Sequence, residues 1–169
     1  MKRALLVVLA VLALPACGPE ATEGQGLKFD FTIAAGIGDT TSGLQVTIVN
    51  RGMSLSCADV QNNCLVDQVS RDRFVQVRDK NGDTHLALTF PLALTAGNPS
   101  TQNVSVGGIQ PGTDYAVVIE ALSKDSPPKL AGSSCNYVKQ ISAGNNAQLI
   151  AATIVPPAMA VGCDPRVEK

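Results

Sequence analysis

Residues 109–121 read IQPGTDYAVVIEA and decide the fold class of this chain. Pro111 and Gly112 are typical turn residues, because proline presets one backbone angle and glycine tolerates unusual ones. After them, Tyr115, Val117 and Ile119 occupy every second position. Side chains of a β-strand point alternately to opposite faces, so this spacing predicts a strand with one buried face. The stretch indicates a domain built from strands and turns.

Further segments on either side combine alternating or β-branched apolar residues with turn residues at their ends. They are residues 27–34, 44–50, 73–78, 84–90, 101–106, 129–141 and 147–155. Beyond the N-terminal segment, no stretch shows helical spacing over three turns. We therefore predict an all-β fold of roughly six to eight short strands, arranged as a single antiparallel β-sandwich over residues 27–157.

Two hairpins are expected. Residues 27–34 and 44–50 are joined by a glycine-rich turn, and residues 73–78 and 84–90 are joined by a turn from Asp79 to Asp83. The oxygen-bearing side chains of that second turn alternate as in a calcium-binding EF-hand loop. Such a loop requires glycine at its sixth position and Glu at its twelfth, whereas here Gly82 is fourth and Phe90 is twelfth. The pattern therefore favours a turn.

The run 109–121 resembles the entry into strand F of fibronectin type III and related immunoglobulin-like sandwiches. In those domains a tyrosine at the position of Tyr115 bonds back to the preceding backbone, and the resemblance implies the same role here, with Pro111 and Gly112 forming the turn. The chain departs from the fibronectin pattern because it has no Trp and carries additional cysteines. Its later strand-like runs are also similar to transthyretin-like and carboxypeptidase-regulatory sandwiches.

The N-terminus has the order of an export signal. Lys2 and Arg3 precede 11 consecutive Ala, Leu and Val residues, and the last of these begins the ending Leu14-Pro15-Ala16-Cys17. This ending resembles the lipobox of bacterial lipoproteins, which implies removal of residues 1–16 and lipidation of Cys17. Residues 18–26 then form a flexible tether, and Gly18 in place of Asp implies the outer membrane. A transmembrane anchor is disfavoured, because the apolar run spans about 16 Å of a core of about 30 Å. An ordinary secreted protein remains the other alternative.

Charge excludes one class of partner. The chain has 13 Lys and Arg against 14 Asp and Glu, and removal of the signal leaves 11 against 14. Nucleic-acid binding depends on a cationic surface that displaces counterions from phosphates. No basic run remains after the signal, so we expect no nucleic-acid partner.

The four remaining cysteines predict two disulfides in an exported chain. They are Cys57, Cys64, Cys135 and Cys163. Three pairings are possible, and we favour Cys57 with Cys64 and Cys135 with Cys163. The second bond would hold an irregular tail, residues 158–169, to a late strand. A zinc site is the alternative, but the spacing of Cys57 and Cys64 is not that of a zinc knuckle and His85 lies in another segment.

Residues 51–71 lack strand periodicity and are expected to form a long surface loop closed by a disulfide. Long loops on a rigid scaffold often carry binding function, so this loop is the candidate contact surface for an envelope protein partner. The alternative is an insertion with a purely structural role. Asn62 lies near its centre.

Catalytic patterns are weak. His85 is the one histidine of the chain, and its sequence has no nucleophile elbow, zinc-protease motif or phosphate loop. The pairs Asp59 with Asp67 and Asp79 with Asp83 are typical of solvated loop acids. We therefore expect no enzyme activity, no cofactor and no metal, with a hydrolase as a disfavoured alternative. The expected function is a lipid-anchored structural or interaction module of the cell envelope. A carbohydrate- or ligand-binding module is the alternative, with Tyr137 as its candidate stacking residue.

Overall fold

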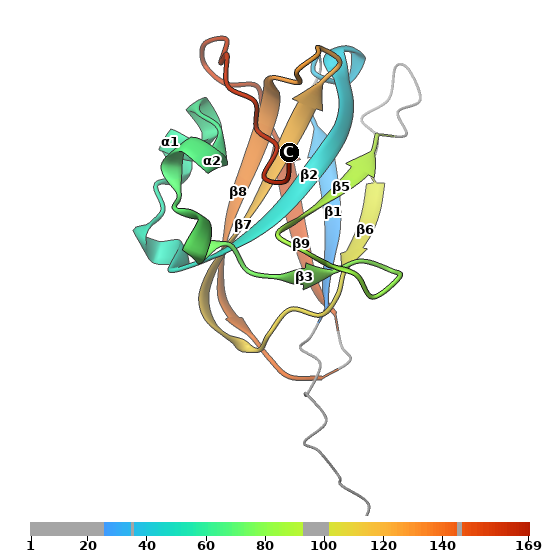
Figure 1. Ribbon diagram of the computed structural model, residues 1–169, viewed down its shortest axis with the longest axis vertical. Helices are drawn as coiled ribbons and strands as arrows, with labels where there is room; N and C mark the ends of the chain where they lie inside the picture. Colours follow the sequence, from blue (N-terminus) through green and yellow to red (C-terminus); the bar gives the residue numbers. More distant parts are fainter. Residues whose placement is uncertain (1–25, 35, 93–101, 145–146) are drawn as a thin grey trace, which may run out of the picture.

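The computed structural model describes residues 26–34, 36–92, 102–144 and 147–169. Strands dominate this part of the chain (Figure 1). They are β1 Leu27–Ile33, β2 Thr41–Asn50, β3 Val77–Arg78, β4 Thr84–His85, β5 Ala87–Pro91, β6 Gln102–Val106, β7 Gly112–Ser123, β8 Leu130–Ile141 and β9 Gln148–Ile154. The helices are α1 Cys57–Asn62 and α2 Leu65–Gln68, with single 3-10 turns η1 Gly38–Thr40, η2 Gly52–Ser54 and η3 Arg71–Arg73. The predicted all-β class is confirmed.

The strands form a three-stranded sheet in the order β6-β1-β9, a four-stranded sheet in the order β5-β2-β7-β8, and a two-stranded ribbon of β3 and β4. Neighbours within them are antiparallel except β1 and β9, which run parallel. The expectation of a purely antiparallel arrangement is therefore wrong. Period-two spacing fixes which face of a strand is buried, but it does not fix the direction of the neighbouring strand.

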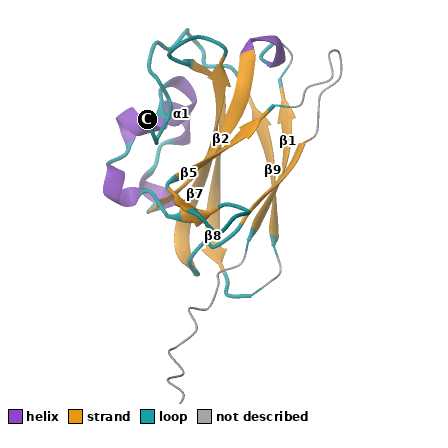
Figure 2. Ribbon diagram, turned by 45° about the vertical axis from the view of Figure 1, so that its right-hand side comes forward, coloured by secondary structure: helices purple, strands orange, loops and turns teal. Residues whose placement is uncertain are grey.

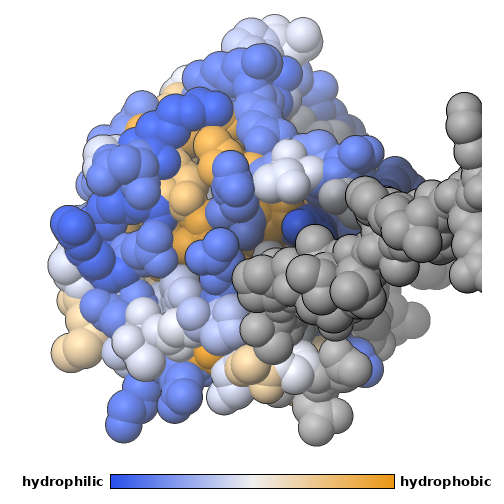
Figure 3. Space-filling view, turned by 60° about the horizontal axis from the view of Figure 1, so that its bottom comes forward, coloured by the Kyte–Doolittle hydropathy of each residue, from blue (hydrophilic) through white to orange (hydrophobic). Residues whose placement is uncertain are grey.

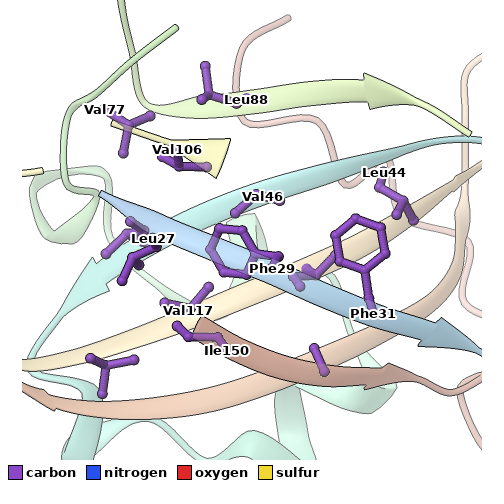
Figure 4. Packing of buried hydrophobic residues seen from close by; sticks show 14 of the residues in the cluster. Leu27, Phe29, Phe31, Leu44, Val46, Val77, Leu88, Val106, Val117 and Ile150 are labelled. Atoms are coloured by element: carbon purple, nitrogen blue, oxygen red, sulfur yellow. The ribbon is translucent and has the colours of Figure 1, made fainter. Parts of the chain in front are cut away.

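One apolar core is shared by the three- and four-stranded sheets. Leu27, Phe29, Phe31 and Ile33 of β1 belong to the same cluster as inward residues of β2 and β7. Figure 4 shows Phe29 among Val46 of β2 and Val117 of β7. Complete burial of such a side chain is worth about 1.5–3 kcal/mol, so this cluster is the main favourable term that holds the two sheets together.

The first expected hairpin, of residues 27–34 with 44–50, is wrong. β1 pairs with β6 and β9, and β2 pairs with β5 and β7. Their apolar faces were read correctly, because both contribute to the shared core. The segments face each other across that core instead of lying edge to edge.

The second expected hairpin is partly confirmed. β3 pairs with β4, and the Asp79 carboxylate accepts hydrogen bonds from the backbone N–H of Asn81 and Asp83, each at 2.9 Å. Gly82 has φ of 88°, which a side chain would strain. Beyond the ribbon, however, β5 leaves this hairpin and pairs with β2.

The outer face of the four-stranded sheet is also covered. Figure 2 shows the helices on one side of this sheet and β1 with β9 on the other. A second apolar cluster lies beneath the helices and the end of the chain, composed of Val49, Val60, Leu65, Val69, Phe74, Ala87, Ala116, Val118 and Val167. Residues 51–73, called the cap below, therefore pack on the sheet. The expectation that residues 51–71 are irregular and closed by a disulfide of their own is wrong, whereas their location at the surface is confirmed.

Candidate functional site

The cap is built from short helical pieces with local signals. α1 begins after Ser56, whose hydroxyl accepts a hydrogen bond from the backbone N–H of Asp59 at 3.3 Å. This is the usual side-chain cap of a helix N-terminus. Val60 points from α1 into the second cluster, and Leu65 does so from α2. Two apolar anchors on two short helices fix the cap against the sheet and leave polar residues outside.

Two disulfides fasten the cap, and their pairing corrects the expectation. Cys57 of α1 is bonded to Cys135 of β8, with a Cα–Cα distance of 5.4 Å. Cys64, directly before α2, is bonded to Cys163, with a Cα–Cα distance of 6.1 Å. The favoured pairing of Cys57 with Cys64 and Cys135 with Cys163 is therefore wrong. It assumed that the loop closes on itself, whereas each cysteine of the cap reaches a different part of the fold.

The end of the chain, residues 163–169, is called the tail below, and a buried glutamine binds its backbone. The side-chain amide nitrogen of Gln45, on the outer face of β2, donates to the carbonyl of Pro165 at 2.8 Å. The backbone N–H of Val167 donates to the Gln45 side-chain oxygen at 3.0 Å. Gln45 is 2% exposed, and Val167 belongs to the second cluster. The tail is thus bound to the sheet through both polar and apolar contacts.

Glu120 of β7 lies beside Gln45 and joins the tail to the cap. One carboxylate oxygen accepts from the Gln45 amide at 3.0 Å, and the other accepts from the backbone N–H of Leu65 at 2.9 Å. Burial raises the pKa of the Glu120 carboxyl to about 7, although both hydrogen bonds lower it. The nearby Asp67 charge raises it further. A carboxyl with fixed donors on both oxygens is held for structure, and it has no open side for a substrate.

A second contact holds the tail near its end. The Glu168 carboxylate accepts from the backbone N–H of Leu86 at 2.6 Å and lies 3.2 Å from Nδ1 of His85. On the other side of the ring, Nε2 of His85 is 3.9 Å from the Asp79 carboxylate. The histidine singled out in the sequence therefore lies between the β3–β4 turn and the tail. The partners of its ring among the described residues are the carboxylates of Glu168 and Asp79, and neither arrangement is that of a base with a Ser, Thr or Cys nucleophile.

Tyr115 makes the contact that the fibronectin resemblance implies. Its hydroxyl donates to the carbonyl of Gln110 at 3.1 Å, just before Pro111. A Cβ at Gly112 would overlap this hydroxyl, so the turn requires glycine there. The backbone of Tyr115 is also closely packed, because a Cβ at Gly52 of the cap would overlap the carbonyl of Tyr115. The corner and the start of the cap therefore fit together without room for an added methyl group.

A hollow of about 500 Å³ lies between the cap and the tail. Its lining is apolar below and mostly charged at the rim: Val66, Val69, Arg71, Phe74, Arg166, Val167, Glu168 and Lys169. Arg166 is paired with Asp164 at 2.8 Å, and that hydrogen bond lowers the pKa of the Asp164 carboxyl. Figure 3 shows one face of the molecule on which apolar residues gather in a recess within a hydrophilic rim. The cap and the tail thus border a hollow on the surface of the domain.

One cluster among the described residues has the composition of a metal site. The sulfurs of Cys64 and Cys163 and the Asp67 carboxylate lie within 4.8 Å of one another. Both sulfurs belong to the disulfide, so they cannot act as thiolate ligands in this state.

The other predicted residues are dispersed. Tyr137 is 47% exposed on β8, away from any second aromatic side chain that the structure describes as exposed. Asn62 is engaged, because its side-chain oxygen accepts from the backbone N–H of Ala158 at 2.9 Å. Asp59 and Asp67 are exposed on different helices. Cys17 and residues 18–25 of the tether lie outside the described residues.

Comparison with known proteins gave no match: no family model, curated protein or solved structure is similar enough to this chain to count as a relative. Within the described ranges, none of the helices has the length and apolar composition needed to cross a membrane.

Gln45 and Glu120 were missed in the sequence, although a signal was present. Val118, Glu120 and Leu122 share the face of β7 opposite to that of Val117 and Ile119. Apolar residues on both faces of one strand indicate that both faces are buried. A charged residue within such a strand must then have buried partners, and a polar residue of a neighbouring buried strand is the natural place to look for one.

Proposed function

We propose that this chain is a lipid-anchored protein of the bacterial outer membrane whose β-sandwich domain, of immunoglobulin-like or fibronectin type III-like type, presents the cap to a protein partner. The lipobox-like ending at Cys17 supports the anchor. Two sheets around one core and the Tyr115 corner support the type of domain. The role is one of binding, without catalysis.

One observation carries the choice of surface. The cap is bonded to β8 by the disulfide of Cys57, bonded to the tail by the disulfide of Cys64, and packed on the sheet through apolar anchors, yet most of its outer residues remain exposed. Surfaces that are rigid before binding lose little conformational entropy on association. A cap that is fixed, polar outside and next to a hollow is the described surface best suited to a specific contact.

Photo-cross-linking in intact cells tests this surface. A photoreactive residue would replace Asp59 of α1 or Gln68 of α2, which are both exposed. Leu149, which is 64% exposed on β9, is the control position. We expect a discrete adduct from the cap positions and none from Leu149. Equal adducts at all positions, or none at the cap, would contradict the assignment.

The anchor is tested separately by Cys17→Ser. We expect the wild-type chain in the membrane fraction and the variant in the soluble fraction, because the polar tether and domain alone have no membrane affinity under this proposal. Unchanged partitioning, together with an unmodified mass at Cys17, would exclude lipidation while leaving the cap assignment open.

A further inference from the structure

The tail is bound to the sheet in the manner of a peptide in a receptor. The contacts come from three separate strands or their ends. Gln45 of β2 pairs with the backbone of Pro165 and Val167, and the backbone of Leu86 between β4 and β5 binds the Glu168 carboxylate. Hydrogen bonds to the tail backbone hold the segment in place, and contacts of its side chains select its sequence.

The sequence-selective contacts are clear. Val167 is 6% exposed and lies in the second apolar cluster, and Glu168 reaches the backbone N–H of Leu86 and the ring of His85. The receptor side has contacts of its own that do not involve the tail, because Glu120 fixes the Gln45 amide through a 3.0 Å hydrogen bond and is itself bound to the backbone of Leu65. The cleft therefore has a defined ligand class: a peptide segment with the order of Pro165-Arg166-Val167-Glu168.

The segment that connects the tail to the rest of the chain is longer than the distance it has to span. Ala158 contacts Asn62, and Cys163 is bonded to Cys64, two residues further along the cap. The segment between Ala158 and Cys163 therefore leaves the cap and returns to it, with mostly exposed residues. Fully extended, its roughly 5 peptide steps would reach about 17 Å, much further than the closed loop requires.

We propose that this cleft also takes the tail of a second copy of the chain, so that two copies exchange tails and place Cys163 of one against Cys64 of the other. The contacts of the tail described above are kept in such an exchange, because the exchanged segment is identical. The closed and exchanged forms then differ mainly in the entropy of association. A short tether gives an effective concentration of roughly millimolar, so exchange requires a comparable local concentration of chains.

Complementary variants of the full chain test this directly. The acceptor carries Cys163→Ser and Val167→Asp, which free Cys64 and expel its own tail. The donor carries Cys64→Ser and Gln45→Leu, which keep an intact tail but damage its own cleft. In a glutathione buffer, the Cys64 thiolate of the acceptor attacks the mixed disulfide between Cys163 of the donor and glutathione. The new disulfide forms and glutathione thiolate leaves.

We expect a disulfide-linked dimer of one acceptor and one donor, with the bond mapped to Cys64 and Cys163. The matched control donor carries Cys64→Ser, Gln45→Leu and Val167→Asp. Loss of the buried valine contact should lower the yield roughly tenfold. Equal yields from both donors would show that the cross-link does not depend on tail recognition and would overturn the proposal. A milder donor with Cys64→Ser alone repeats the test if Gln45→Leu prevents folding.

The unaltered chain provides a second test that needs no variant. It is refolded oxidatively at about 5 µM and at about 500 µM, well below and close to the effective concentration of the tether. We expect monomer at the lower value and a rising fraction of dimer linked between Cys64 and Cys163 at the higher value. Monomer alone at both values, with Cys64 and Cys163 bonded within one chain, would contradict exchange.

Discussion

Replacing Glu120 by glutamine tests the buried network through the pH dependence of stability. Burial raises the pKa of this carboxyl from its ordinary value of 4.5 to about 7 in the folded chain. Between those values the folded chain binds more protons than the unfolded chain, so the free energy of unfolding falls as the pH rises. The contribution is fully present below pH 4.5 and lost above about pH 7, and it amounts to about 3 kcal/mol.

Glutamine has the shape of the protonated carboxyl and does not titrate. Wild type should therefore lose roughly 2–3 kcal/mol of unfolding free energy as the pH rises from about 5 to about 8, and the Glu120→Gln chain should not show this loss. The difference in unfolding free energy, variant minus wild type, should rise by that amount over the same pH range. Urea unfolding with both disulfides intact measures this difference. The exposed Asp59→Asn is the control and should leave the pH profile unchanged. A Glu120→Gln profile parallel to wild type would refute the reasoning.

Three further changes have expected results in the same unfolding assay. Tyr115→Phe removes one hydrogen bond and should cost about 1 kcal/mol. Gly52→Ala forces a methyl group into the backbone of Tyr115 and should cost about 2 kcal/mol or more, whereas Gly162→Ala, with nothing within 4 Å, should be close to neutral. Replacing Cys57 and Cys135 together by Ser opens a bond across 78 residues, for which loop entropy predicts a loss of up to about 4.5 kcal/mol.

Local patterns predicted the strands but not their partners. Residues 109–121 gave the turn and the strand of β7 because a two-residue period and a Pro-Gly turn act over a few positions. The pairing of β1 with β9 depends on how distant segments meet around the core, which no local period contains. The buried faces of β1 and β2 were predicted correctly, yet the two strands belong to different sheets.

The cap and the disulfides show the same limit. The cap has few apolar residues, and those that become buried, Val60, Leu65 and Val69, are separated by mostly polar ones. The segment therefore shows no helical period and was predicted to be irregular. The three buried residues become anchors because Val49, Ala116 and Val118 on the outer face of β2 and β7 are apolar and are buried beneath the cap. The pairing of Cys57 with Cys135 follows from that packing, which places α1 against β8.

Disulfide mapping of the oxidised chain tests most directly how the cap and the tail are fastened to the rest of the fold. Cleavage before Asp59 separates Cys57 from Cys64, and cleavage after Lys139 separates Cys135 from Cys163. Mass spectrometry without reduction should then find Cys57 linked to Cys135 and Cys64 linked to Cys163. Fragments that join Cys57 to Cys64 and Cys135 to Cys163 would contradict the account.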